Sequence, residues 1–286
     1  MSAMKLCRFN DDRLGVVRGG MVHDVTAALD VLPTMRWPLP HGDAFIAHLD
    51  AVRERADALV DEAKTHPLES VRLLSPVANP SKIIGAPVNY AAHKDEIDEN
   101  IAHGHAIKPI SEWGLFLKSN TSLVGASQGV ERRFPDQRND HEVELAVVIG
   151  RQGDRIPYAD AMSYIAGYAI GLDMTLRGPQ FQSFRKSIDT YSVLGPWLVT
   201  ADELTDPSDL ELRIGVNGDL RQQSRTRMLI CDVPRLIEYA SSFYTLYPGD
   251  IIMTGTPDGV GPVVGGDMME ATIEGVGTMR VAVRDA

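Results

Sequence analysis

Two glutamates separated by one residue stand at the start of an apolar segment, His141–Gly150. In a β-strand successive side chains point to opposite faces, so Glu142 and Glu144 would project together from one face. Their carboxylates would lie about 7 Å apart and repel each other, on a strand whose apolar remainder favours burial. A hard divalent cation would relieve both the repulsion and the desolvation. The alternative is an exposed strand face whose acids simply meet water.

A third carboxylate, Asp173, ends the small and apolar segment GYAIGLD. Alone, an acid in such a place is typical of a helix cap. Joined to Glu142 and Glu144, it would complete an all-oxygen site of three carboxylates. Such a site suits Mg²⁺, Mn²⁺ or Ca²⁺ and disfavours zinc or copper.

Two further segments carry groups that could move protons or bind anions. If NYAAHKDE, Asn89–Glu96, is helical, then His93 and Glu96 are neighbours on one face. A carboxylate beside an imidazole orients the ring and raises its basicity, as a general base for water requires. Lys186 is a candidate cation for a substrate carboxylate or enolate. The alternatives are a surface ion pair and a solvated ammonium group.

The elements that must position these residues are mainly strands. Residues 4–32 alternate apolar and polar positions around turn-like pairs, which predicts short strands and hairpins. Helical spacing then runs from Asp43, a capping residue, to about Lys64. We expect a small α+β domain over residues 1–70 and a catalytic domain over residues 71–286.

The second part of the chain is strand-rich and punctuated by glycine. Asn217-Gly218 between two strand-like runs predicts a hairpin. One helix is expected after the capping residue Asp232, with apolar residues on one face as far as Tyr244. Strands and helices do not alternate regularly, which favours a mainly β fold with some α over a doubly wound sheet.

Composition excludes several classes of function. The chain has 286 residues, with 28 Lys and Arg against 39 Asp and Glu, a net charge of −11, and this acidity argues against nucleic acid as a partner. No apolar run approaches the roughly 18 residues of a membrane helix. The charged N-terminus and two cysteines predict a cytoplasmic protein without disulfides. There is no P-loop, GxGxxG, CxxC or HExxH pattern.

Eight segments, in order from Lys82 to the C-terminus, together resemble the fumarylacetoacetate hydrolase family. The branch is that of the acylpyruvate hydrolases and the 2-hydroxyhepta-2,4-diene-1,7-dioate isomerase-like enzymes. The segments are KIIGAPVNYAAHKDE, FLKSN, HEVELAVVIG, GYAIGLDMTLRGPQ, KSIDTYSVLGPWLVT, VNGDLRQQSRTRML, YPGDIIMTGTPDGVG and IEGVG. The resemblance implies a β-sandwich roll, usually a homodimer, that carries a divalent metal, Mg²⁺ or Mn²⁺, with Ca²⁺ also compatible.

The resemblance also implies roles for single residues. It makes Glu142, Glu144 and Asp173 metal ligands, makes His93 and Glu96 a catalytic dyad on a lid, makes Lys186 the active-site lysine, and makes Arg177, Gln180 and Thr256 substrate contacts. The chain departs from the usual pattern at Gly178-Pro179, around Phe181–Arg185 and in a long lid, residues 97–112. These departures bear on the substrate rather than on the metal.

The resulting hypothesis is a hydrolase of catabolism that cleaves a C–C bond in a small 1,3-dicarbonyl 2-oxo acid, such as an acylpyruvate or a fumarylacetoacetate-like compound. The second reading keeps the metal and the enolate but removes the water, as an isomerase, decarboxylase or dehydratase of 2-oxo acids. The non-enzyme reading is a structural Ca²⁺ site in a β-rich binding module. That reading leaves His93, Glu96 and Lys186 unexplained.

Overall fold

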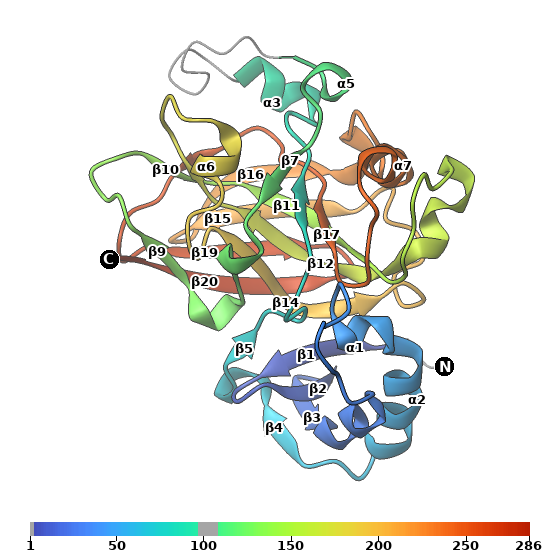
Figure 1. Ribbon diagram of the computed structural model, residues 1–286. Coiled ribbons are helices and arrows are strands. Elements are labelled where there is room, and N and C mark those ends of the chain that lie inside the picture. Colours follow the sequence, from blue (N-terminus) through green and yellow to red (C-terminus); the bar gives the residue numbers. More distant parts are fainter. Residues whose placement is uncertain (1–2, 97–107) are drawn as a thin grey trace.

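The computed structural model describes residues 3–96 and 108–286, with the backbone alone for residues 94–96. The prediction of a mainly β chain is confirmed, because three sheets form the body and only short helices cover it (Figure 1). These helices are α1 (Ala44–Ala47), α2 (Leu49–Leu59), α3 (Ala91–Glu96), α5 (Ile110–Trp113), α6 (Gln182–Arg185) and α7 (Val233–Phe243). No helix in the described ranges is long and apolar enough to cross a membrane.

The largest sheet has twelve strands and runs through the whole molecule. In order its strands are β4 (Thr65–Pro67), β3 (Met21–Asp24), β2 (Arg13–Arg18), β1 (Lys5–Phe9), β14 (Ser192–Thr200), β12 (Ile165–Asp173), β11 (Val143–Ile149), β17 (Ile251–Met253), β6 (Ile83–Gly85) and β7 (Phe116–Lys118); β5 (Leu73–Leu74) pairs with β1, and β8 (Leu123–Val124) with β14. Because β1 pairs with β14, the N-terminal strands continue the sheet that carries the acids. The domain boundary near residue 70 stays a prediction.

Two smaller sheets complete the body. The five-stranded sheet has the order β16 (Asp219–Arg225), β15 (Glu211–Val216), β19 (Met268–Ile273), β20 (Gly277–Asp285) and β9 (Val130–Arg132). The three-stranded sheet has the order β13 (Thr175–Leu176), β10 (Asn139–His141) and β18 (Gly261–Pro262). Strand β13 follows β12 closely in the chain and β10 precedes β11, so the small sheet lies at the end where the three acids stand.

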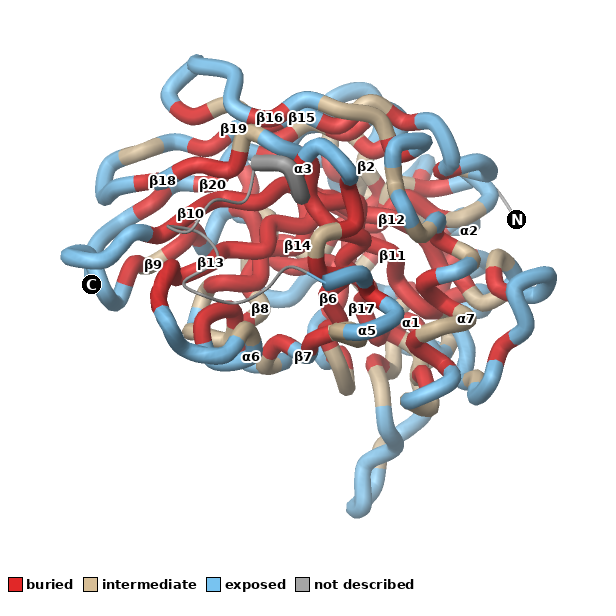
Figure 2. Tube along the Cα trace, turned by 90° about the horizontal axis from the view of Figure 1, so that it is seen from above, coloured by how far each residue is buried: buried red, intermediate tan, exposed pale blue. Residues whose placement is uncertain are grey.

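The central strands of the long sheet are buried on both faces, as Figure 2 shows for β11, β12 and β14. On one face, Leu145 and Val147 of β11 belong to a core shared with the five-stranded sheet and α7. On the other face, Ala146 and Val148 pack in a second core with apolar residues of α2. The alternation predicted for this strand is confirmed, and the double burial explains why almost all of β11 is apolar.

The helix expected from Asp43 to Lys64 is shorter and broken. Asp43 caps α1 as predicted, since its side chain accepts a hydrogen bond from the N–H of Ile46. The chain then leaves helical geometry at His48, and α2 ends at Leu59. The His48 ring hydrogen-bonds the carbonyl of Ala44, at 3.0 Å. In an unbroken helix the backbone N–H of His48 would use that carbonyl, so the side chain replaces the backbone as its partner.

Two local predictions in the second half of the chain are confirmed. Asn217 and Gly218 join β15 to β16 with positive φ angles of 54° and 90°, as a two-residue hairpin turn requires. Asp232 caps α7 by accepting a hydrogen bond from the N–H of Arg235. Both features depend on neighbours in the chain, which is why sequence patterns predict them well.

Candidate active site

Three carboxylates meet at the ends of two neighbouring strands. Glu142 lies between β10 and β11, Glu144 is the second residue of β11, and Asp173 is the last residue of β12. The N–H of Asp173 donates a 2.9 Å hydrogen bond to the carbonyl of Glu142, so the antiparallel ladder sets these two residues side by side. Ligand oxygens of all three residues lie within 4.8 Å of one another. The spacing predicted from the sequence therefore produces a real cluster.

Burial excludes the two simpler explanations for these acids. Glu142 is 4 % exposed, Glu144 2 % and Asp173 0 %, so none of them is an acid on a solvated strand face. Asp173 does not cap a helix, because its carboxylate oxygens contact the ammonium groups of Lys118 and Lys186. The cluster is a buried, charged site.

The two glutamates differ in their surroundings. Burial, together with the charges of Asp173 and Glu142, raises the pKa of Glu144 well above its usual range. Its Oε2 accepts a 2.7 Å hydrogen bond from the N–H of Gly255. Burial opposes ionisation of Glu142 as well, but the charges of Lys186 and Arg177 outweigh it and hold the pKa of Glu142 well below its usual range. Of the two glutamates, Glu144 is thus the one whose negative charge a further positive charge would stabilise more.

Lys186 directly follows α6, and its ammonium group donates to two of the acids and to one hydroxyl. Its Nζ donates to Glu142 Oε2 at 2.7 Å, to Asp173 Oδ2 at 2.5 Å and to the hydroxyl of Thr175 at 2.8 Å. Lys118, at the end of β7, contacts the other oxygen of Asp173 and donates to the carbonyl of Tyr191 at 2.7 Å. Sequence reasoning assigned no role to Lys118, although a lysine directly after the apolar run Leu115–Leu117 was a signal.

Arg177 and Asp140 extend the charged network. Arg177 donates from Nε to Asp140 Oδ2 at 2.7 Å and from Nη2 to Glu142 Oε1 at 2.8 Å. The guanidinium predicted to contact substrate is therefore already bound to two carboxylates. Asp140 was missed, although it continues the same every-second-residue spacing as Glu142 and Glu144. The role of Arg177 toward substrate stays a prediction.

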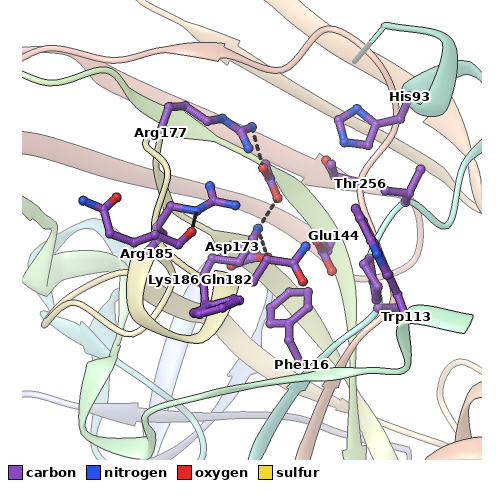
Figure 3. A pocket seen from close by; sticks show the side chains of 16 residues that line it. His93, Trp113, Phe116, Glu144, Asp173, Arg177, Gln182, Arg185, Lys186 and Thr256 are labelled. Carbon is purple, nitrogen blue, oxygen red and sulfur yellow. Dashed lines mark hydrogen bonds and ion pairs between the residues drawn. The ribbon is translucent and has the colours of Figure 1, made fainter. Parts of the chain in front are cut away.

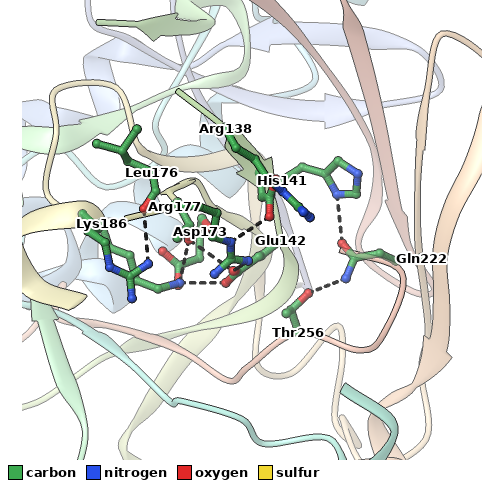
Figure 4. A network of polar contacts seen from close by, with 12 residues as sticks. Arg138, His141, Glu142, Asp173, Leu176, Arg177, Lys186, Gln222 and Thr256 are labelled. Carbon is green, nitrogen blue, oxygen red and sulfur yellow. Dashed lines mark hydrogen bonds and ion pairs between the residues drawn. The ribbon is translucent and has the colours of Figure 1, made fainter. Parts of the chain in front are cut away.

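A neutral hydrogen-bond network supports the strand that carries the glutamates (Figure 4). The Gln222 amide oxygen accepts from the N–H of Val143 and contacts His141 Nδ1, both at 3.1 Å. Its nitrogen donates to the hydroxyl of Thr256 at 2.8 Å, and that hydroxyl donates to the carbonyl of Val143 at 2.9 Å. Thr256 lines the pocket, but in this structure its hydroxyl is hydrogen-bonded to the backbone carbonyl of Val143, between Glu142 and Glu144. No local pattern pointed to Gln222.

A pocket of about 320 Å³ opens over the acids and contains most of the predicted site (Figure 3). His93, on α3, lines it and is only 6 % exposed. Gln180 stands at its exposed edge, and Trp113 and Phe116 supply apolar walls. In the view of Figure 3, His93 and Lys186 lie on opposite sides of the pocket. The side chain of Glu96 and most of the predicted lid, residues 97–107, lie outside the described residues.

Gly125–Gly129 spells a Gly-x-Ser-x-Gly pattern, which in serine hydrolases carries the nucleophile on a turn between a strand and an α-helix. Here the segment is a 3₁₀ turn, Ala126–Gln128. The hydroxyl of Ser127 accepts a 2.9 Å hydrogen bond from the N–H of Leu73 and is not part of the pocket lining. The serine therefore has a structural role.

The chemistry of the three acids fits a hard divalent cation. In the described part of the chain they are the one group of acids, histidines and cysteines close enough to hold an ion. All are oxygen donors, all are buried, and at Glu144 burial and the neighbouring acids already oppose the negative charge. Oxygen-only ligation is typical of Mg²⁺, Mn²⁺ and Ca²⁺.

Known proteins resemble this chain along its whole length. Residues 82–284 match the family described as fumarylacetoacetate (FAA) hydrolase, C-terminal. A maleylpyruvate hydrolase of Aquipseudomonas alcaligenes is 54% identical, over 98% of this chain and 99% of that protein. A mitochondrial oxaloacetate tautomerase of Bos taurus is 37% identical, over 91% of this chain and 83% of that protein.

The fold also matches solved structures. The crystal structure of maleylpyruvate hydrolase from Sphingobium sp. SYK-6, in complex with manganese(II) and pyruvate, superposes with a TM-score of 0.84. The two proteins are 39% identical, and the match covers 99% of this chain and all of that one. The predicted family and its β-rich fold are confirmed.

Proposed function

Because the chain belongs to the fumarylacetoacetate hydrolase family, we propose that it is a divalent-metal-dependent hydrolase that cleaves the C–C bond of an acylpyruvate. The observation that carries the proposal is the buried triad of Glu142, Glu144 and Asp173 at the base of a pocket that His93 also lines. The similarity to two maleylpyruvate hydrolases, one of them crystallised with manganese(II) and pyruvate, supports it.

Glu142, Glu144 and Asp173 would hold the ion, with Mg²⁺ or Mn²⁺ as the expected metal and Ca²⁺ also compatible with the ligands. When bound, such an ion supplies positive charge that attracts the oxygens of a 2-oxo acid and stabilises a developing enolate. Lys118, Lys186 and Arg177 fix the orientation of two of these acids, Asp173 and Glu142, through charge-assisted hydrogen bonds.

His93 is the proposed general base. A ring nitrogen of His93 would take the proton of a water molecule while the water oxygen adds to the carbonyl of the acyl group. The proposed partner that orients the ring is Glu96, which lies three residues later on α3. The burial of His93 keeps the ring in the pocket rather than in bulk solvent.

When the C–C bond breaks, its electron pair stays with the pyruvate fragment. The bond between the acyl carbon and C3 of the pyruvate unit breaks, and its electron pair forms an enolate. Protonation at C3 gives pyruvate, and the acyl group leaves as a carboxylic acid that carries the water oxygen. Lys186 could assist the enolate only by exchanging one of its three present acceptors, because all three of its N–H groups are engaged in this structure.

A second reading is a tautomerase, isomerase, decarboxylase or dehydratase of 2-oxo acids. It is favoured by one observation, the 37% identity to an oxaloacetate tautomerase. In this reading His93 moves a proton at a substrate carbon instead of activating water. The same residues would serve both reactions, so the choice depends on products.

The test follows the loss of enol absorbance of an acylpyruvate panel that includes maleylpyruvate, with Mn²⁺ or Mg²⁺ and with EDTA. The hydrolase proposal expects metal-dependent loss with pyruvate and a carboxylic acid formed in equal amounts. Loss of the enol without pyruvate, or turnover of oxaloacetate alone, would establish the second reading. His93→Asn should abolish turnover, whereas the control His48→Asn, outside the pocket, should retain it.

The proposal extends to a homodimer that works in the cytoplasm. The family resemblance supports the dimer, and the two unpaired thiols, Cys7 and Cys231, support a reducing compartment. Light scattering on the purified protein tests the dimer, and a monomer at micromolar concentration would exclude it. Cell fractionation tests the compartment.

A further inference from the structure

With a divalent ion bound, the surroundings of the pocket would carry more positive than negative charge. Around it the described residues bury four carboxylates, Asp140, Glu142, Glu144 and Asp173, and four cations, Lys118, Arg177, Arg185 and Lys186. These buried charges balance in the protein alone, and Arg138, whose side chain is 38 % exposed, adds one more cation 2.8 Å from Asp140. A bound divalent ion therefore leaves a surplus of at least two positive charges, which a substrate with two negative charges would offset.

Arg185 differs from the other three cations. Lys118, Lys186 and Arg177 each contact at least one of the four acids. Arg185 has no carboxylate partner among the described residues: its Nε donates to the carbonyl of Gln180 at 2.8 Å and its Nη1 to the carbonyl of Leu176 at 3.2 Å. These two bonds hold the guanidinium in place and leave Nη2 without an acceptor in the described part of the protein.

Arg185 lies where its guanidinium can contact a bound molecule. The residue is only 7 % exposed and lines the pocket (Figure 3). Burial and the nearby positive charge of Arg177 oppose its ionised form and lower its pKa, and they outweigh the opposite effect of the charges of Glu142 and Asp173. A guanidinium nevertheless remains charged in proteins and matches a carboxylate with two parallel hydrogen bonds. A buried, tethered guanidinium that no carboxylate of the described residues contacts is thus a preformed carboxylate site.

We propose that Arg185 binds a second carboxylate of the substrate, at the far end of its acyl chain, and thereby selects dicarboxylic acylpyruvates over neutral-tailed ones. The inference rests on the proposed function, which sets the 2-oxo acid end of the substrate at Glu142, Glu144 and Asp173. Arg185 is then a specificity-determining residue that does not take part in bond cleavage. The competing explanation is structural: Arg185 would only brace the Leu176–Gln180 turn through the two carbonyls.

Binding of two non-cleavable probes separates these explanations. We would titrate Mn²⁺-loaded protein with 2-oxoheptanedioate and with 2-oxoheptanoate, which share the 2-oxo acid end and differ in the terminal carboxylate. Calorimetry should show the dioate binding at least about tenfold more tightly, as a charge-assisted pair supplies. Arg185→Met should abolish that preference and leave the affinities for the monoacid and for Mn²⁺ within about twofold of wild type. The control is Arg155→Met, an 81 % exposed side chain.

Two results would overturn the inference. The first is that the wild type binds both probes with equal affinity; the second is that Arg185→Met weakens the binding of both probes by the same factor. The second result would establish the bracing role, and a melting curve of the variant would show it independently. Failure of the proposed function gives a different result. In that case the dioate preference and its dependence on Arg185 persist, but no acylpyruvate yields pyruvate.

Turnover supplies a second readout. An acylpyruvate that ends in a carboxylate should be cleaved with a kcat/KM about 100-fold above that of its terminal methyl ester, because the ester leaves Arg185 unpaired. Arg185→Met should lower kcat/KM for the acid but not for the ester, so that the two values become similar. A wild-type enzyme that cleaves the ester as well as the acid would exclude Arg185 as the selecting residue.

Discussion

Lys118 and Lys186 hold opposite oxygens of one buried carboxylate, that of Asp173. Lys118 reaches it from β7 and Lys186 from the end of α6. Burial lowers the pKa of Lys118. At Lys186 burial acts in the same direction, but the charges of Asp173 and Glu142 outweigh it and raise the pKa. The carboxylate of Asp173 is therefore fixed in orientation from both sides.

Removal of Lys118 should destabilise the protein strongly. In Lys118→Met, Asp173 loses one of its two cations while still buried, and breaking such a buried pair costs about 3 kcal/mol of unfolding free energy or more. Urea denaturation measures this loss. The matched control is Arg280→Met, which breaks a pair with Glu270 whose side chains are 70 % and 53 % exposed and should change stability by less than about 1 kcal/mol. Similar losses in the two variants would contradict the argument.

Gln222 should matter for both stability and metal affinity. Gln222→Leu would leave the N–H of Val143 without its acceptor and Thr256 without a donor, and buried groups left unsatisfied cost about 1–3 kcal/mol each. Since Val143 lies between Glu142 and Glu144, we also expect weaker Mn²⁺ binding in a calorimetric titration. The adjacent Gln223 is exposed on the same strand, so Gln223→Leu serves as the control. An unchanged Mn²⁺ affinity in Gln222→Leu would show that the hydrogen bonds of Gln222 do not affect metal binding.

Chelation should abolish turnover and lower the melting temperature only through the lost binding energy. At a free metal concentration of 100 times Kd, that energy is about 2.7 kcal/mol. Glu144→Gln should lose metal binding, yet its metal-free form should be at least as stable as the metal-free wild type, because one of three repelling buried carboxylates is gone. Full activity in EDTA or in Glu144→Gln would overturn the metal assignment. Unchanged turnover with a lower melting temperature would establish a structural ion.

Cys7 should make the protein sensitive to alkaline pH. Burial raises the pKa of its thiol from 9.0 to about 12 in the folded protein. Above about pH 9 the unfolded chain loses this proton and the folded chain keeps it, so stability falls as pH rises through the window between these two values. From pH 8 to pH 10 the wild type should lose about 1.4 kcal/mol more than Cys7→Ala in urea denaturation. A constant difference between the two proteins across this range would exclude the effect.

Features governed by neighbours in the chain could be predicted from the sequence. The alternation in HEVELAVVIG predicted that Glu142, just before β11, and Glu144, within β11, project to the same side, because side chains of any strand alternate. The Asn217-Gly218 turn and the Asp232 cap follow from the backbone angles and hydrogen bonds that those residue types favour. The family and its β-rich fold followed from the order of the motifs.

Features that depend on residues far apart in the chain were decided by the tertiary structure alone. Lys118 meets Asp173 only because β7 and the end of β12 come together in space, and Gln222 reaches Val143 from another sheet. The break at His48 depends on which acceptor its ring finds. The sequence by itself therefore determined which groups could do chemistry, since strand periodicity is local. Long-range packing decides which of those groups are already neutralised. It also decides that Arg185 has no acidic partner among the described residues.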